Sequence, residues 1–291
     1  MRVQRGALIA LLLSLIGIGV CVYLTIVHIA LLRGELFGGA VCGAVGTLFN
    51  CHAVTASPIG SPWGVPLSLW GLIGYLATFS LALIAWQFSE VSSTALVSLV
   101  AVSLAFVIID VGLFIAMVTQ IRYLCPLCLL TYAVNFLLLV VSKWASARPW
   151  QQIVREIPAA MGALVPTARA AAAWVFWGIV ATGSLGVFAV HASTAFVSLG
   201  APGAFRKQMV QFISQQPPVT VNTQGDPALG SAHPSIQIVE FSDFLCPSCQ
   251  RASTFNPILL AGHRQHVAFV LKHFPLDTSC NDTIKRMMHP N

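Results

Sequence analysis

Charge is what this sequence has least of. Only 8% of its 291 residues are Asp, Glu, Lys or Arg, whereas 57% are hydrophobic. A soluble domain carries about 25% charged residues, so the composition excludes an ordinary soluble enzyme and predicts a membrane protein. The net charge of +6 is modest and spread along the chain, which does not indicate a nucleic-acid partner. Internal repeats and low-complexity tracts are also missing.

Long apolar runs account for most of the first two thirds of the chain. They are about 20 residues long, which is enough to cross the ~30 Å apolar core of a bilayer. The first run is too long for the apolar core of a signal peptide. The predicted transmembrane spans are residues 6–32, 65–88, 94–121, 126–141 and 170–190.

Basic residues give these spans an orientation. Arg2 and Arg5 precede the first span, and the connection after the fourth span is also basic. That connection carries Lys143, Arg148, Arg155 and Arg169 against one acid, Glu156. The positive-inside rule therefore places the N-terminus in the cytoplasm and, after five spans, the C-terminal tail on the outer side.

The 8 cysteines are many for a cytosolic enzyme. Most of them form close pairs, namely Cys42/Cys51, Cys125/Cys128 and Cys246/Cys249, which leaves Cys21 and Cys280. The predicted topology places all of these pairs at or beyond the outer membrane face. Paired thiols in such positions indicate an oxidising compartment or redox chemistry.

The last pair follows a predicted strand, residues 236–241, in the sequence Cys246-Pro-Ser-Cys249. A dithiol between a strand and a helix start is the thioredoxin arrangement, in which the helix stabilises a thiolate on the first cysteine. Cys246 would be the nucleophile and Cys249 the resolving thiol. Half of a zinc site is the alternative, but no second pair with ligand spacing follows. Because about 42 residues remain, we expect a truncated domain that is poorly packed, inactive or completed by another chain.

The other two pairs have different surroundings. Cys125 and Cys128 lie at the start of the fourth span, where a quinone in the bilayer can reach them. The alternative is a pair of buried structural cysteines. Cys42 and Cys51 lie in the loop 33–66, from which a dithiol can accept a disulfide and pass it on by exchange. A static loop disulfide is the alternative there.

Asp110 lies in the middle of the third span. A carboxyl at that depth is costly and is a functional candidate by default. It would either relay protons or hydrogen-bond a neighbouring helix. After the fifth span, residues 192–235 read as a linker that contains a short amphipathic helix around Phe205, Met209 and Phe212.

Residues 7–145 resemble the vitamin K epoxide reductase family. The motifs are the loop cysteines, Ser61-x-Trp63-Gly64, and Cys125-x-x-Cys128 followed by Thr131-Tyr132-Ala133-x-Asn135. With a fifth helix and a tail that looks like the DsbA branch of thioredoxin folds, the chain is similar to the bacterial fused members. That resemblance implies oxidation of a periplasmic thiol partner and transfer of two electrons to quinone.

The resemblance also implies roles for single residues. Cys128 would contact the quinone, Cys125 would exchange with Cys51, and Cys42 would face the thioredoxin-like partner. The predicted quinone site consists of Cys128, Tyr132, Ser61, Trp63 and Asp110, with Trp63 as its lid. Vertebrate members place an asparagine at the start of the second span, where this chain has Leu67-Ser68. Ubiquinone or menaquinone is therefore expected rather than a vitamin K epoxide, and no metal is expected.

The predicted fold class is mainly α: a four-helix membrane bundle, a fifth transmembrane helix and a partial α/β thioredoxin-like tail. The predicted domains are 1–145 (catalytic), 146–192 (connection and fifth span), 193–235 (periplasmic linker) and 236–291 (tail). The predicted function is a thiol:quinone oxidoreductase in the bacterial inner membrane that forms disulfide bonds in periplasmic proteins. Its partners would be membrane lipid, the quinone pool, and periplasmic thiol proteins or a separate thioredoxin-like protein. The alternatives are a quinone epoxide reductase and a non-catalytic membrane anchor.

Overall fold

The structure is a computed structural model that describes residues 1–32, 37–38, 42, 48–165, 171–261 and 263–285. Within these residues, 5 helices are long and apolar enough to cross a membrane. These are α1 (Arg2–Leu32), α4 (Leu67–Gln87), α5 (Ser92–Ala116) with its π-helical extension η2 (Met117–Ile121), α6 (Pro126–Ser146) and the first part of α8 (Ala171–Ser214). The protein is an integral membrane protein, and the predicted fold class is confirmed.

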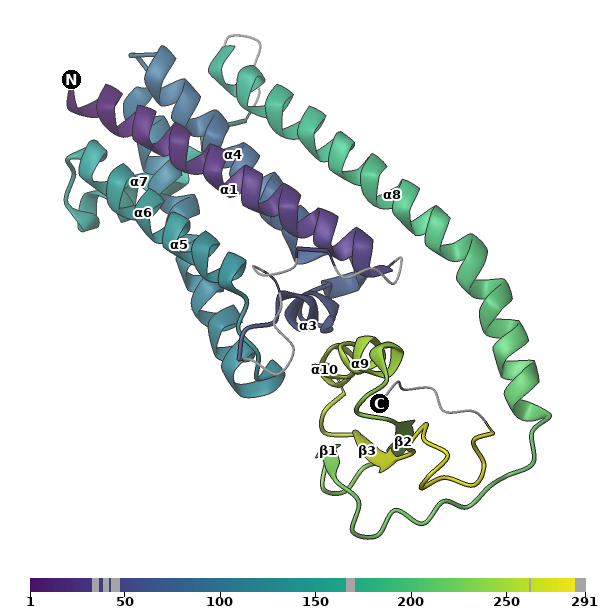
Figure 1. Ribbon diagram of the computed structural model, residues 1–291. Helices are drawn as coiled ribbons and strands as arrows, with labels where there is room; N and C mark the ends of the chain where they lie inside the picture. Colours follow the sequence, from purple (N-terminus) through teal and green to yellow (C-terminus); the bar gives the residue numbers. More distant parts are fainter. Residues whose placement is uncertain (33–36, 39–41, 43–47, 166–170, 262, 286–291) are drawn as a thin grey trace.

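Helices α1, α4, α5 and α6 pack together as a bundle, and α8 lies along α4 (Figure 1). Short connections join α4 to α5 and α5 to α6, so consecutive helices run in opposite directions. The ends of α1 and α5 and the starts of α4 and α6 therefore meet at one end of the bundle, together with the short helix α3 (Cys51–Ala56) (Figure 1). The predicted cysteine pairs Cys42/Cys51 and Cys125/Cys128 therefore lie at this end of the bundle.

Helix α1 approaches α4 closely because its contact residues are small. Gly17 is buried, and a Cβ atom built on it would lie 2.2 to 2.4 Å from ring atoms of Tyr75. One turn before it, Ser14 and Thr78 join their hydroxyls across the same interface at 3.0 Å. In a membrane, such small residues permit the close packing that holds helices together.

Replacement of Gly17 by alanine is expected to lower the free energy of unfolding by about 1–3 kcal/mol, because the new methyl group would overlap the Tyr75 ring. The matched control is Gly19→Ala on the same helix, where a Cβ atom meets nothing within 4 Å. Thermal unfolding of the two variants in detergent tests this difference. Equal melting temperatures would show that α1 does not pack against Tyr75 in this way.

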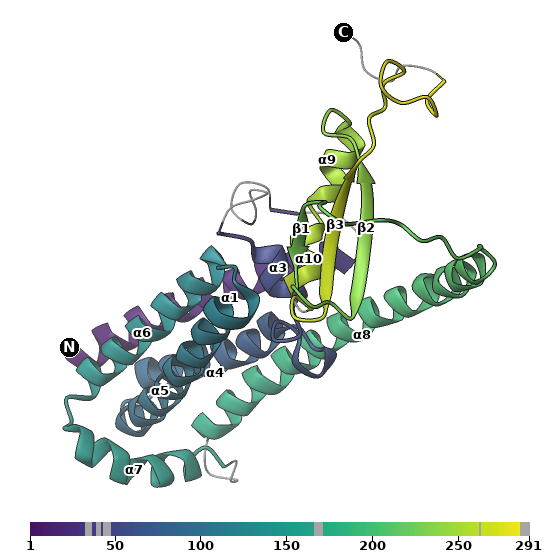
Figure 2. The ribbon, with the colours of Figure 1, turned by 90° about the horizontal axis from the view of Figure 1, so that it is seen from below.

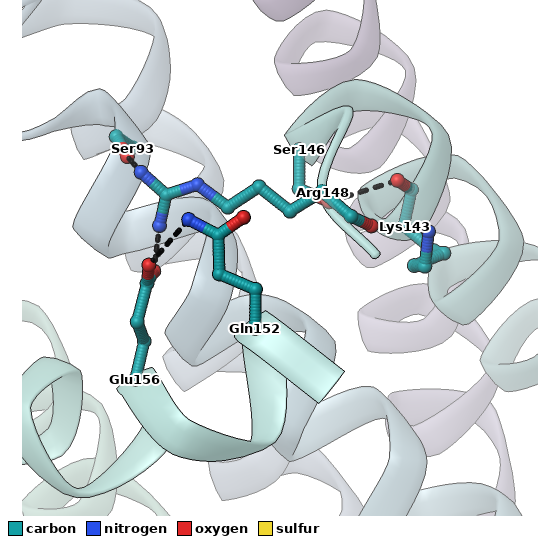
Figure 3. A network of polar contacts seen from close by, with 6 residues as sticks. All are labelled: Ser93, Lys143, Ser146, Arg148, Gln152 and Glu156. Carbon is teal, nitrogen blue, oxygen red and sulfur yellow. Dashed lines mark hydrogen bonds and ion pairs between the residues drawn. The ribbon is translucent and has the colours of Figure 1, made fainter. Parts of the chain in front are cut away.

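Between α6 and α8 the structure adds an amphipathic helix, α7 (Trp150–Gly162), which sequence reasoning treated only as a basic connection. Its apolar residues Ile153 and Ala160 are buried against Val97 and Val100 of α5. A polar network holds its start (Figure 3). Arg148 pairs with Glu156 and also donates to Ser93 of α5, while Gln152 donates to Glu156 at 2.8 Å. This network fixes α7 across the end of the bundle.

Helix α8 differs from the prediction. A linker was expected from residue 193, with a separate short helix inside it, but α8 continues without a break to Ser214. The residues around 191 include neither proline nor glycine, so nothing ends the helix there. It stops shortly before Pro217-Pro218, where proline cannot continue a helix. Of the predicted amphipathic residues, the side chains of Phe205 and Met209 lie outside the described part.

The C-terminal part is a small α/β unit. Its elements are β1 (Ala228–Gly230), β2 (Ile236–Ser242), α9 (Pro247–Ser253), α10 (Asn256–Ala261) and β3 (Val267–His273). The strand order is β1-β3-β2, with β2 and β3 parallel and β1 antiparallel to β3. The two helices form the crossover between the parallel strands, and Leu260 of α10 is fully buried against the sheet region.

This unit rests on the same end of the bundle through α10, which packs on α3 (Figure 2). Ala261 joins the buried cluster that contains Cys42 and Cys51. The guanidinium of Arg264 lies 6.0 Å from the ring centroid of Tyr123. The tail therefore covers the loop cysteines with α10, and its own dithiol lies at the start of the neighbouring helix α9.

Candidate functional site

Backbone hydrogen bonds join the two segments that carry the central cysteines. Asn50 N–H donates to Leu124 O at 2.9 Å, and Leu124 N–H donates to Leu48 O at 2.9 Å. These bonds and a bridge between Phe49 and Leu124 hold the residue before Cys51 beside the residue before Cys125. Two cysteines 74 positions apart in the sequence are thereby brought together.

Each central cysteine lies at the start of a helix. Asn50 caps α3, with its Oδ1 accepting from Ala53 N–H at 2.9 Å, so Cys51 is the first residue of that helix. Cys125 caps α6, and its Sγ accepts from Cys128 N–H at 3.2 Å. Pro126 follows at the first helical position, where its missing N–H costs nothing. The helix starts supply N–H groups that favour negative charge on sulfur.

The four cysteines of the membrane part form a continuous chain of side-chain hydrogen bonds. Cys42 bonds to Cys51, Cys51 to Cys125, and Cys125 to Cys128. Cys42, Cys51 and Cys125 are at most 1% exposed, whereas Cys128 is partly exposed. Sulfurs in this order need no large movement to exchange a disulfide from one to the next.

Cys51 is the cysteine of this chain whose thiolate form is favoured. Hydrogen bonds from the thiols of Cys125 and Cys42 lower the pKa of Cys51 well below that of a free thiol. The pKa values of its two neighbours move the other way. The pKa of Cys42 is raised by its bond to Cys51 and by burial, and that of Cys125 is raised by its bonds to Cys128 and Cys51 and by burial. The attacking group in exchange is a thiolate, so Cys51 is the nucleophile suited to attack a disulfide at Cys125.

Cys128 faces a cavity of about 220 Å³ between the helices. Of the predicted quinone residues, Cys128, Tyr132 and Asp110 line this cavity. Trp63 and Ser61 are not among its lining residues. The Trp63 side chain is 90% exposed, but it meets Trp70 edge-on at 6.2 Å, and Trp70 does line the cavity. Their roles in quinone binding stay predictions.

Sequence reasoning missed a polar chain at the side of this cavity. Tyr75 OH donates to Asn135 Oδ1 at 2.7 Å, and Asn135 Nδ2 donates to Asp110 Oδ2 at 2.8 Å. All three residues line the cavity, and they come from α4, α6 and α5. Asp110 therefore does hydrogen-bond a neighbouring helix. The sequence signal available for these partners was the presence of polar residues in the apolar helices α4 and α6, several in each helix.

The tail dithiol has the geometry of a helix-capping cysteine pair. Cys246 precedes α9, and its Sγ accepts from Cys249 N–H at 3.4 Å and lies 2.9 Å from Ser248 Oγ. Hydrogen bonds from Cys249 and Ser248 lower the pKa of Cys246 to about 7. The structure thus favours Cys246 over Cys249 as the nucleophile of this pair.

The alkylation rate of Cys246 by iodoacetamide is expected to rise with pH through a midpoint near 7, because the thiolate is the form that reacts. Peptide-resolved mass spectrometry of the reduced protein measures this rate. Ser248→Ala should move the midpoint upward, because one stabilising hydrogen bond is lost. A midpoint unchanged from that of a free thiol, near 8.5, would contradict the assignment.

Among the described residues, no group of three or more His, Cys, Asp or Glu side chains is placed to hold a metal ion. The leftover Cys280 is exposed, and Cys21 is buried beside the cavity. Neither belongs to the sulfur chain of Cys42, Cys51, Cys125 and Cys128.

Comparison with known proteins agrees with this geometry. No curated protein matches the chain. A family model does match: residues 8–143 fit the one described as the vitamin K epoxide reductase family. The match covers α1, α4, α5 and nearly all of α6, the elements that carry both central cysteine pairs and the cavity. The membrane bundle of this chain is therefore a member of the vitamin K epoxide reductase family, whose proteins are membrane oxidoreductases that link thiols to quinones.

Proposed function

We propose that this protein oxidises the thiols of proteins outside the cytoplasm and passes the electrons to a quinone of the bacterial inner membrane. The order of transfer would be client thiols, Cys246/Cys249, Cys42/Cys51, Cys125/Cys128, quinone. In sum, two thiols and one quinone become one disulfide and one hydroquinone, so two electrons and two protons reach the quinone. The observation that carries the proposal is the hydrogen-bonded chain of four cysteines that ends at the cavity.

Each step has a thiolate that attacks a disulfide. When the quinone has oxidised Cys125 and Cys128 to a disulfide, the Cys51 thiolate attacks Cys125 and releases Cys128. Cys42 then attacks Cys51 and releases Cys125, which leaves a Cys42–Cys51 disulfide in the loop. The tail dithiol reduces that disulfide with Cys246 as the attacking group. The low pKa of Cys51 and the lowered pKa of Cys246 support these roles.

The cavity is better suited to bind an apolar quinone than the surface of the water-facing part of the protein is. Its lining is mostly apolar, and besides Cys128 its polar residues include Tyr132, Asp110 and Asn135. In this proposal the apolar ring and chain occupy the helix-lined part, and the carbonyl oxygens face the polar groups. Asp110 serves as the proton carrier, since the carboxyl lies at the cavity within the span.

The proposal also assigns a role or a side of the membrane to each part of the chain. Residues 1–145 would be the catalytic domain and 236–291 a thioredoxin-like partner unit, with the tail outside and residues 143–169 in the cytoplasm. The basic residues of that connection support this orientation. Ubiquinone or menaquinone is favoured over an epoxide because Leu67 and Ser68 line the cavity where vertebrate members carry an amide. A non-catalytic anchor would not account for the aligned sulfurs.

The test is quinone reduction by the purified full-length protein, with a reduced, unfolded cysteine-containing protein as electron donor. Loss of quinone absorbance and gain of client disulfides should occur together, in a one-to-one ratio. Cys51→Ala should remove both, because it interrupts the sulfur chain between Cys42 and Cys125. Cys280→Ser is the control that should leave both unchanged. Quinone reduction that persists in Cys51→Ala would contradict the proposed order of electron transfer.

A further inference from the structure

A groove at the opposite end of the bundle has the character of a lipid site. It has a volume of about 620 Å³ and is formed by the start of α1, the second half of α6 and the segment that enters α7. One part is apolar, with Phe136, Leu139 and Val140 of α6. The other part is cationic, with Arg2, Lys143 and Arg148. It shares no lining residue with the cavity beside Cys128.

The apolar part is a stripe along α6. Phe136, Val140 and Trp144 follow one another at four-residue spacing and are 56%, 46% and 45% exposed. Residues at this spacing share one face of a helix. On a transmembrane helix such a face is covered by acyl chains. The stripe leads directly to the cationic part of the groove, so an acyl chain laid on it would end beside Lys143.

The cations of the groove differ in whether a carboxylate already neutralises their charge. Arg148 extends toward Ser93 and Glu156, away from Lys143 (Figure 3), and is neutralised by Glu156. Arg2 and Lys143 have no carboxylate within ion-pair distance in the described part of the chain. Arg2 lies 5.0 Å from the Trp144 ring centroid, and Lys143 lies 5.3 Å from that of Trp150. Lys143 Nζ also donates to Arg148 O at 2.6 Å.

These contacts hold two cations in place without neutralising them. Each lies over an aromatic face, which orients a cation but leaves its other side open to an anion. Both aromatic residues are tryptophans, the side chains that occupy the headgroup level of a bilayer. A basic pocket between transmembrane helices on the cytoplasmic side is a setting in which anionic lipid headgroups bind.

We propose that this groove binds an anionic phospholipid of the cytoplasmic leaflet. Its phosphate would lie between Arg2 and Lys143, and one acyl chain would follow Phe136 and Val140. The lipid would join α1, α6 and the entry to α7. The proposal goes beyond the redox function and does not depend on it.

The experiment uses the full-length protein in neutral detergent. Phosphatidylglycerol or phosphatidylcholine with the same acyl chains is titrated in, and bound lipid is measured by native mass spectrometry together with the melting temperature. Wild type should retain phosphatidylglycerol and gain stability from it, and phosphatidylcholine should do neither. The double variant Arg2→Gln/Lys143→Gln should bind phosphatidylglycerol about 25-fold more weakly, about fivefold for each cation.

Three comparisons keep the result interpretable. Arg122→Gln/Lys207→Gln removes two exposed cations outside the groove and should bind as wild type does. Lys143→Arg keeps the charge and should also retain the lipid. The deacylated headgroup glycerophosphoglycerol should give no shift at the same concentration, because it lacks the acyl chain. The proposal is overturned if the double variant binds as tightly as wild type, if phosphatidylcholine binds equally well, or if the free headgroup gives the same shift.

Discussion

Cys128→Ala is expected to slow quinone reduction by at least about 10³-fold, the largest effect of any single substitution in this chain. Cys128 is the only cysteine of the sulfur chain that is partly exposed and lines the cavity. Without its sulfur, the electrons held by Cys125 have no group that meets the quinone. Anaerobic stopped-flow absorbance of the quinone, with the fully reduced protein as donor, measures the rate of a single turnover.

The control for this variant comes from the same cavity. Cys21 also lines it but is not part of the sulfur chain, so Cys21→Ala should keep the rate within a few-fold. A companion variant, Cys42→Ala, should accumulate a Cys51–Cys125 disulfide in the presence of quinone. Cys51 can still attack an oxidised Cys125, but Cys42 is no longer there to resolve the bond. Full turnover by Cys128→Ala would show that the quinone takes electrons from another cysteine.

Asp110→Asn is expected to lower the rate of quinone reduction by about 100-fold, at the lower end of the range for removal of a general acid or base. Reduction of a quinone adds two protons, and the interior of the bilayer offers few groups that can deliver them. Asp110 lies at the cavity and is held by Asn135 Nδ2 at 2.8 Å. An amide has nearly the same shape but cannot carry the proton.

Two further measurements separate this role from a structural one. The rate of exchange between Cys51 and a disulfide at Cys125 should be unchanged in Asp110→Asn, because that step involves no quinone. Ser103→Ala on the same helix is the matched control, since Ser103 is buried but does not line the cavity. Equal losses of quinone reduction and of thiol exchange would assign Asp110 to helix packing instead.

Much of the site could be foreseen because a membrane simplifies the geometry. Once the apolar runs are assigned to spans, their alternating direction puts Cys42, Cys51 and the Cys125/Cys128 pair at one end of the bundle. The family motifs then supplied their order. The sequence could not supply the backbone ladder through Leu124, because hydrogen bonds between two loops leave no periodic pattern. That ladder is what brings Cys51 against Cys125.

The remaining differences between the predictions and the structure also have local causes. Tyr75 and Asn135 are each one of several polar residues in an apolar helix, and nothing in their own helices indicates that they face each other. Helix α7 was within reach of sequence reasoning, since Ile153, Ile157 and Ala160 have helical spacing within the basic connection. The length of α8 was missed because a change of composition was taken for a change of structure.

The burial of Cys51 and Cys125 limits which reductants can reach these two sulfurs directly. Cys51 and Cys125 are 0% exposed, so a small thiol dissolved in water cannot collide with either of them. In the proposed transfer, electrons would enter from a docked protein at the Cys42 end of the sulfur chain and leave to the lipid phase at the Cys128 end. The two buried sulfurs between these ends would then be protected from small thiols in solution.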